Sequence, residues 1–422
     1  MLLEFSVQNY RSIKEEQTFS LVAGSSMAKP DNFSVQQLYE STMPVLKSAV
    51  IYGANASGKT NIIRAFSTCV FLIKESAGYV VQDPIKYYDP FLFDEDAKNS
   101  PTFFRVTFIG LDHIKYKYQF SYNKEEIIHE SLDYFPKGQT ANLFTRKNDT
   151  VGGNFVHEVR LGNQLKDQRI DKKLFKNQLY LSQFGSRIVH EQLTPIFLYF
   201  KEIETWNAVN KGYIDNYLQN NLIKELLAPE NIEIKKRLSK LIRIADTKIE
   251  DVRIEEKKPT PAQKKEYTLY GRHSVYRDNN KTGGHELPFQ EESAGSNVLY
   301  IIGGLILKKL TSGGILFVDE LDNSLHPKLS KFLIKLFNNP VSNPKNAQLV
   351  CATHEVTLLD KDMFRTDQVW FTEKNKFGGT ELYSISDFEG TREGIPFDKW
   401  YQSGKFGGEP RIKEIEFIFG DE

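Results

Sequence analysis

The stretch Gly53-Ala54-Asn55-Ala56-Ser57-Gly58-Lys59-Thr60 decides the fold class, because it fits the phosphate-loop pattern GxxxxGK[ST] at every fixed position. Its glycines let the backbone wrap a phosphate chain with N–H groups pointing inward, and a helix that starts there adds its positive end. A short apolar run, Lys47–Tyr52, precedes the loop, and apolar residues at helical spacing follow over Thr60–Ser76. The sequence therefore predicts a strand, a phosphate loop and a helix in that order.

The residue types in this loop suit a nucleoside triphosphate with its magnesium ion. We expect Lys59 to reach the β- and γ-phosphates and the Thr60 hydroxyl to hold Mg²⁺. The predicted nucleotide-binding residues are Gly53, Asn55, Ser57, Gly58, Lys59, Thr60 and Asn61.

A second pair of acidic residues follows the buried run Ile315–Val318. Two carboxylates at the end of a buried strand are costly unless they face a cation or a solvated cleft. In a phosphate-loop protein, Asp319 would complete the Mg²⁺ shell through water, and Glu320 could polarise the attacking water as general base.

The order of patterns along the chain predicts an α/β core that is split by an insertion. Strands alternate with helices near both ends of the chain, which is typical of a parallel sheet, whereas residues 101–135 alternate like an antiparallel meander. We divide the chain into 1–195, with the phosphate loop and the meander, 196–289, a mixed insertion, and 290–422, with the acidic strand. Within the insertion, residues 196–245 read as helical and 246–289 as short strands.

Composition narrows the classes of protein that remain. Lys+Arg and Asp+Glu are both 55 of 422 residues, so a globally basic chain is excluded. Two cysteines exclude a disulfide scaffold, and the cytoplasm is the simplest compartment. The start MLLEFSVQNYRSI is no signal peptide, no run is long enough to span a membrane, and HExxH and paired CxxC patterns are absent.

Ser293-Ala294-Gly295-Ser296-Asn297 forms a small turn at the start of an apolar helix, 22 residues before Ile315. Such a turn is an anion-binding arrangement. The phosphate loop, the long insertion, this turn, the acidic strand and a histidine strand occur in the order that resembles ABC-type ATPase heads of the RecF, SMC and OLD group.

Over essentially the whole chain, the sequence resembles the stand-alone AAA15-type ATPases of prokaryotes. These include the RloA/AbiL ATPases of abortive-infection and phage-defence operons, which are encoded beside a TOPRIM-like partner. The segments that carry this resemblance are FSVQNYRSI, YGANASGKTNIIRA, ESAGSNVL, ILFVDELDNSLHP, ATHEVTLLD and YQSGKFGGEPR.

The resemblance implies roles for four further residues. Ser293 and Gly295 match the signature residues that contact the γ-phosphate bound to the opposite protomer, so ATP would join two chains in a homodimer or larger assembly. His354 matches the histidine that senses the γ-phosphate. Arg11 matches an arginine that contacts nucleotide phosphates, although a plain surface arginine is an equal alternative.

Three departures from the family pattern remain. The signature reads SAG instead of SGG, and the usual aspartate after the acidic strand is replaced by His326, with Asn323 as another candidate for its role. The glutamine that usually approaches the metal has no clear match in the sequence, and Gln119 and Gln183 are two candidates for it.

The resemblance implies an ATPase whose nucleotide state controls an effector such as a TOPRIM-like nuclease in anti-phage defence. One alternative is a nucleotide-bound scaffold that sequesters an effector with little turnover. Another is a RecF-like repair ATPase that binds DNA through the basic stretch Lys235–Arg243, whose simpler interpretation is a solvated helix face balanced by nearby glutamates.

Overall fold

The computed structural model describes all residues except 152–153, 167, 208–213, 246–247, 258–265 and 410–422. The chain forms two compact units. The first unit comprises Met1–Thr205 and Val350–Glu422, and the second unit comprises Trp206–Leu349. The two ends of the sequence therefore belong to one unit.

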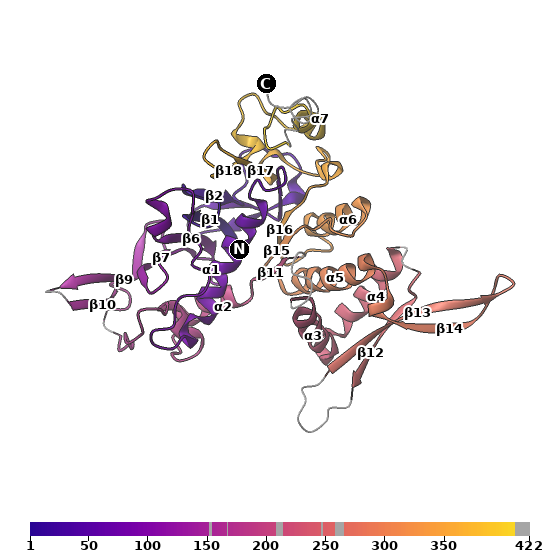
Figure 1. Ribbon diagram of the computed structural model, residues 1–422, viewed down its shortest axis with the longest axis horizontal. Helices are drawn as coiled ribbons and strands as arrows, with labels where there is room; N and C mark the ends of the chain where they lie inside the picture. The colour runs from indigo at the N-terminus through magenta and orange to yellow at the C-terminus, as the bar shows by residue number, and fades with distance from the viewer. Residues whose placement is uncertain (152–153, 167, 208–213, 246–247, 258–265, 410–422) are drawn as a thin grey trace. The chain divides into compact units, whose positions relative to one another are not determined.

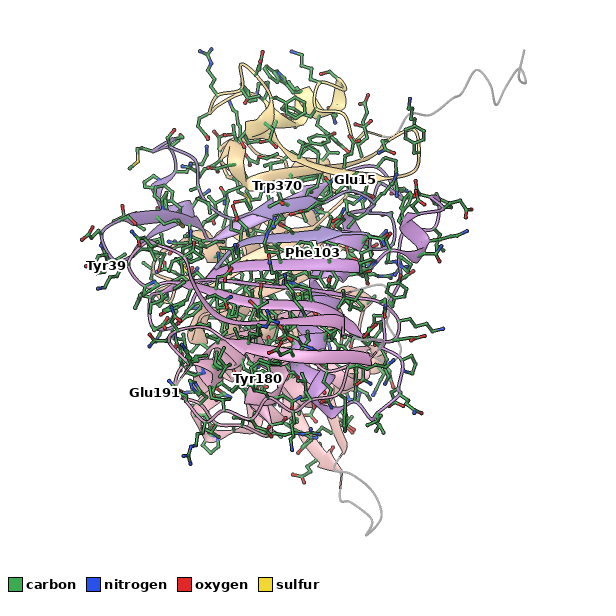
Figure 2. The ribbon with its side chains drawn as sticks, turned by 90° about the vertical axis from the view of Figure 1, so that its left-hand side faces the viewer. Glu15, Tyr39, Phe103, Tyr180, Glu191 and Trp370 are labelled. Carbon is green, nitrogen blue, oxygen red and sulfur yellow. The ribbon has the colours of Figure 1, made fainter. Side chains whose placement is uncertain are left out.

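An antiparallel sheet of seven strands makes up much of the first unit, in the order β10-β9-β8-β7-β6-β1-β2. Figure 2 shows these strands side by side, with Phe103 on β6. Aromatic residues alternate along β7, where Tyr116, Tyr118, Phe120 and Tyr122 are all buried. The predicted meander is thus confirmed, since β6 pairs with β7 and β7 with β8. The bounds are β1 Leu2–Gln8, β2 Gln17–Ser20, β6 Thr102–Ile109, β7 Lys115–Tyr122, β8 Ile127–Phe135, β9 Ala141–Val151 and β10 Asn154–Leu161.

A second group of strands in the first unit carries the phosphate loop. β5 (Ser48–Tyr52) runs parallel to β17 (Val369–Lys374), and β18 (Thr380–Ser384) continues antiparallel to β17. On the other side of β5 lies β16 (Gln348–Ala352). The remaining elements of this unit are the hairpin β3 Phe33–Gln37 and β4 Thr42–Leu46, and the helices α1 Lys59–Glu75, α2 Leu193–Lys201 and α7 Phe397–Gln402.

The second unit joins a group of helices to a small antiparallel sheet in the order β12-β13-β14. Two adjacent glycines of α5 allow two helices to approach it closely. A Cβ atom on Gly303 would lie 2.7 Å from Leu241 of α4, and one on Gly304 would lie 2.6 Å from Leu222 of α3. The elements are α3 Ile214–Leu227, α4 Ile232–Ile244, β12 Asp251–Lys257, β13 Glu266–Arg277, β14 Asn280–Pro288, α5 Ala294–Ser312, β15 Ile315–Asp319 and α6 Pro327–Asn338.

Within the stretch 196–245 that we predict to be helical, α2, α3 and α4 are helices, and residues 208–213 lie outside the described residues. Glu204–Asn207 forms the short strand β11 inside the stretch expected to be helical, so the prediction is wrong at these four residues. Thr205 and Trp206 favour extended structure, and Trp206 is buried, which outweighs the helical pattern on either side. Among the helices that the structure describes, none has the length and apolar character needed to span a bilayer.

Candidate nucleotide-binding site

The phosphate loop joins β5 to α1 as predicted, and its two outer glycines stand where no other residue fits. Gly53 has φ 151° and Gly58 has φ 116°, which L-residues with side chains rarely adopt. A Cβ atom would also lie 2.5 Å from the Thr372 carbonyl oxygen at Gly53 and 2.2 Å from Thr380 Oγ1 at Gly58. Both the backbone angle and the packing therefore require glycine.

Two threonines from the far end of the chain hold the middle of this loop. The hydroxyls of Ser57 and Thr372 lie 2.6 Å apart, and Thr380 Oγ1 donates to the Ser57 carbonyl oxygen at 2.9 Å. Thr372 is on β17 and Thr380 on β18, and both are almost fully buried. Sequence reasoning missed both residues, because neither belongs to a short motif.

Lys59 is buried at the first position of α1, and its ammonium group donates to the Gly53 and Ala54 carbonyl oxygens at 2.6 and 3.0 Å. The helix has Gly58 as its N-cap, which offers no side-chain acceptor to the first N–H groups. These groups and the positive end of the helix can bind an anion. Thr60 is partly exposed at the next position, and Asn55 is exposed at the tip of the loop.

The turn after β1 is connected to the same loop. Asn61 Nδ2 donates to Ser12 Oγ at 2.6 Å, and the Ser12 and Thr380 hydroxyls lie 2.8 Å apart. Arg11 has φ 52°, and its Nε atom lies 3.3 Å from Asp89 Oδ2 in a partly exposed ion pair. Asn61 thus belongs to a hydrogen-bonded chain, whereas Arg11 is held by a carboxylate that a phosphate would have to replace.

His354 follows β16 and is exposed. The preceding residue, Thr353, donates its N–H to the Ile51 carbonyl oxygen of β5 at 3.1 Å. Since Ile51 is two residues before Gly53, the structure brings the backbone next to His354 close to the start of the phosphate loop.

A glycine-rich turn near the end of the described chain also borders the loop. A Cβ atom on Gly408 would lie 3.4 Å from the Thr372 carbonyl oxygen and 3.8 Å from Gly53 Cα. Tyr401 donates its hydroxyl to the Gly408 carbonyl oxygen at 3.1 Å, and Tyr383 donates to Phe406 at 2.8 Å. Burial raises the pKa of both tyrosines, so both hydroxyls stay protonated and can donate.

The acidic strand lies in the second unit. All five residues of β15 are buried, and Asp319 at its end is 1% exposed. Glu320 is partly exposed and has φ 55°, an unusual angle for a residue with a side chain. Asn323 Nδ2 donates to Glu320 Oε2 at 3.3 Å, so the carboxylate has a defined neighbour.

The signature turn lies against the segment that follows this strand. Ser293 caps α5, its Oγ atom accepting from the Ser296 N–H at 3.1 Å. A Cβ atom on Gly295 would lie 2.7 Å from the Ser324 carbonyl oxygen, so only glycine allows this approach. His326 caps α6 by accepting from the Lys328 N–H at 3.1 Å, which gives this residue a structural role.

The predicted site residues divide between the two units. Arg11, residues 53–61 and His354 belong to the first unit, and Ser293, Gly295, Asp319 and Glu320 belong to the second.

Neither glutamine candidate is placed as an obvious metal-approaching residue. Gln119 lies in the middle of β7. Gln183 is 2% exposed and donates to Gln178 Oε1 at 3.1 Å. The segment before Gln183 is fixed by the buried Glu130, which accepts from the Tyr180 N–H at 2.7 Å and whose pKa is raised by burial.

Comparison with known proteins identifies the family. The profile described as "AAA domain, putative AbiEii toxin, Type IV TA system" matches residues 48–360, well over half of the chain. The chain belongs to this AAA domain family. In this AAA domain protein the phosphate loop lies between β5 and α1, in an α/β arrangement with β5 parallel to β17. No curated protein matches the chain.

Several solved structures are similar to this AAA domain protein at low identity. The SMC head domain from Thermotoga maritima is 12% identical, with a TM-score of 0.38, over 91% of this chain and 98% of the other. The Smc head domain from Pyrococcus furiosus, bound to the C-terminal domain of ScpA, is 10% identical, with a TM-score of 0.42, over 91% and 96%. The recombination mediator protein RecF-ATPrS is 12% identical, with a TM-score of 0.35, over 90% and 98%.

Proposed function

We propose that this chain binds and hydrolyses ATP, and that its nucleotide state controls a partner protein. The geometry of the phosphate loop carries the proposal. Gly53 and Gly58 occupy positions that exclude side chains, and Ser57 is bonded to both Thr372 and Thr380. A loop held in this form presents its backbone N–H groups to a triphosphate with little reorganisation, and Lys59 would exchange the Gly53 and Ala54 carbonyl oxygens for phosphate oxygens.

The proposed ligands of ATP and Mg²⁺ are those that the sequence predicts. Lys59 and the N–H groups at the start of α1 would bind the β- and γ-phosphates. The Thr60 hydroxyl and the buried Asp319 carboxylate are oxygen donors, which Mg²⁺ prefers, so the residues fit this ion. When bound, Mg²⁺ would neutralise charge on the phosphate oxygens.

Glu320 is the proposed general base. Its carboxylate would take a proton from water as the water oxygen attacks the γ-phosphorus, and the bond between that phosphorus and the β,γ-bridging oxygen breaks to leave ADP. Asn323, bonded to Glu320 Oε2, would orient the carboxylate. His354 would hydrogen-bond the γ-phosphate and so distinguish ATP from ADP.

We further propose that Ser293 and Gly295 complete the site of a second copy of the chain. Ser293 is exposed at the N-terminus of α5, which suits a γ-phosphate presented from outside the chain. This arrangement predicts that a chain with a defective phosphate loop can still support hydrolysis by its partner.

Mixing two inactive variants tests this arrangement. Lys59→Ala removes phosphate binding, whereas Ser293→Asp keeps a good helix N-cap but opposes the phosphate with a negative charge. Ser293→Asn is the matched control, because it also caps the helix and carries no charge. Each variant is assayed for phosphate release alone and as an equal mixture.

The shared site predicts that the mixture regains roughly a quarter of wild-type activity, since half of the dimers are mixed and each has one intact site. Ser293→Asn alone should retain much more activity than Ser293→Asp. A mixture as inactive as its two components would contradict the shared site while leaving ATP binding by the phosphate loop intact.

The family description names an AbiEii toxin and a type IV toxin–antitoxin system, which supports an effector-controlling role in anti-phage defence. A TOPRIM-like nuclease is the effector we propose. Cys69 and Cys351 are free and buried, which suits the cytoplasm. Co-purification with the products of neighbouring genes, in ATP and in ADP, tests this proposal. The effector should co-purify with the chain in the presence of one nucleotide and be released in the presence of the other.

A scaffold with little turnover is the competing function. It would need Lys59 for nucleotide binding but would work without Glu320. Effector control that survives Glu320→Gln in cells and fails with Lys59→Ala would favour the scaffold over the hydrolysing switch.

A further inference from the structure

A groove of about 740 Å³ lies within the second unit, between α4 and the sheet β12-β13-β14. Figure 1 shows α4 beside α5 and the β13–β14 hairpin extending beyond these helices. The groove uses none of the residues of the proposed ATP site.

Helix α4 forms one wall and is strongly basic. Its sequence has five cations and one acid, Glu233. The apolar side packs on α5, because Gly303 leaves room for Leu238 and Leu241. Lys235, Ser239 and Arg243 recur every four residues and line the groove with Lys236.

No described residue forms an ion pair with Lys235, Lys236 or Arg243, and Lys236 and Arg243 are exposed. At 1.5 Å per residue, the side chains at 235 and 243 are spaced by about 12 Å along the helix. The wall is therefore a row of cations, each available to an anion.

Acidic residues of the opposite wall are already engaged. Glu250 pairs with Lys281 at 2.6 Å, and this contact lowers the pKa of Glu250. Glu286 pairs with Arg253 at 2.8 Å. The third acidic residue that lines the groove is Asp251, which lies directly opposite Arg272 in the β12–β13 pair. Positive charge is thus in excess in the groove as a whole.

We propose that this groove binds the phosphate backbone of double-stranded DNA, a site that goes beyond the proposed control of an effector by ATP. Long cations at helical spacing suit a row of phosphates. The adjacent hairpin continues with the exposed Arg277, and a two-stranded ribbon fits the major groove. A protein partner is less suited, because interfaces are anchored by aromatic side chains and none lines the groove.

Salt-dependent binding of the full chain to a short fluorescent duplex tests the proposal. Three phosphate contacts give a slope of about −2.7 in log K against log salt, or roughly forty-fold weaker binding from about 50 to 200 mM salt. The variant Lys235→Glu/Lys236→Glu should bind at least tenfold more weakly, with a slope shallower by about two.

Lys172→Glu/Lys173→Glu is the matched control, since it makes the same charge change at two exposed lysines of the first unit. It should bind the duplex like the wild type, and both variants should melt near the wild-type temperature and keep ATP hydrolysis. Equal weakening by the two charge reversals would overturn the groove as the site. Tighter binding of polyaspartate than of the duplex, lost on reversal of Lys235 and Lys236, would overturn nucleic acid in favour of an acidic protein.

Discussion

The hydroxyl group of Thr380 donates a hydrogen bond of 2.9 Å to the Ser57 carbonyl oxygen, across a separation of 323 residues. Thr380 also lies 2.8 Å from the Ser12 hydroxyl, and its N–H donates to the Ser12 carbonyl oxygen at 2.7 Å. One buried threonine on β18 therefore joins the turn after β1 to the phosphate loop. The loop's shape depends on the last third of the chain as much as on its own motif.

Replacement of Thr380 by valine should weaken ATP binding. Valine keeps the shape but removes both hydroxyl contacts, each worth about 1 kcal/mol, so we expect binding to weaken by up to roughly thirtyfold. Calorimetric titration with ATP-Mg²⁺ measures this change. Thr107→Val is the control, because Thr107 is a buried threonine of β6 away from the loop. Unchanged affinity in Thr380→Val would show that the loop holds its shape without these contacts.

Gly58→Ala should abolish ATP binding in a protein that still folds. The added methyl group would lie 2.2 Å from Thr380 Oγ1 and would require the φ of 116° that alanine disfavours. Gly138→Ala serves as the control, since Gly138 also has positive φ but faces open space. Binding of a fluorescent ATP analogue compares the two variants. Equal, near-normal binding by both would contradict the geometry assigned to Gly58.

The glycine-rich turn near the end of the described chain should also support ATP binding. Tyr401→Phe/Tyr383→Phe removes the two hydroxyls that hold Gly408 and Phe406. We expect several-fold weaker ATP binding and a loss of roughly 2 kcal/mol of unfolding free energy, about 1 kcal/mol for each bond. Tyr88→Phe, which removes a 2.8 Å bond to Ser100, should lower stability alone. If the two variants bound ATP with equal affinity, this turn would have no role in ATP binding.

A buried ion pair in the first unit should matter for stability. Arg365 is fully buried, bonds Asp367 at 2.7 and 2.9 Å, and donates to the Ser26 and Ala28 carbonyl oxygens. Arg365→Met should cost about 3–5 kcal/mol of unfolding free energy, because Asp367 stays buried without a counter-ion. Urea unfolding measures the loss, and the exposed Arg160→Met should cost no more than about 1 kcal/mol. A similar small loss for both would refute this role of Arg365.

The phosphate loop could be predicted from sequence because its requirements are local. A glycine at 53, a glycine at 58 and a lysine at 59 stand within one turn of chain, and the flanking strand and helix show their own periodicity. Thr372, Thr380 and Gly408 could not be predicted in the same way. They reach the loop through strand pairing and a distant turn, and each is an ordinary residue in its local sequence.

The signature turn could be predicted from the sequence only in part. The sequence places Ser293 in a small turn at the start of an apolar helix, and in the structure Ser293 is the N-cap of α5. The need for glycine at 295 comes instead from Ser324, whose carbonyl oxygen approaches from the segment after β15. The short strand Glu204–Asn207 was missed for a similar reason, because burial of Trp206 is decided by packing rather than by local pattern. The catalytic roles of Lys59, Glu320 and His354 stay predictions.

The solution mass of Glu320→Gln with ATP-Mg²⁺ and with ADP-Mg²⁺, measured by light scattering, tests the central claim most directly. The substitution should keep nucleotide binding while blocking water activation, so the ATP-bound form accumulates. We predict a mass with ATP about twice that with ADP, and loss of this difference when Ser293→Asp is added. A mass that is the same with both nucleotides would contradict an ATPase whose two copies are joined by ATP.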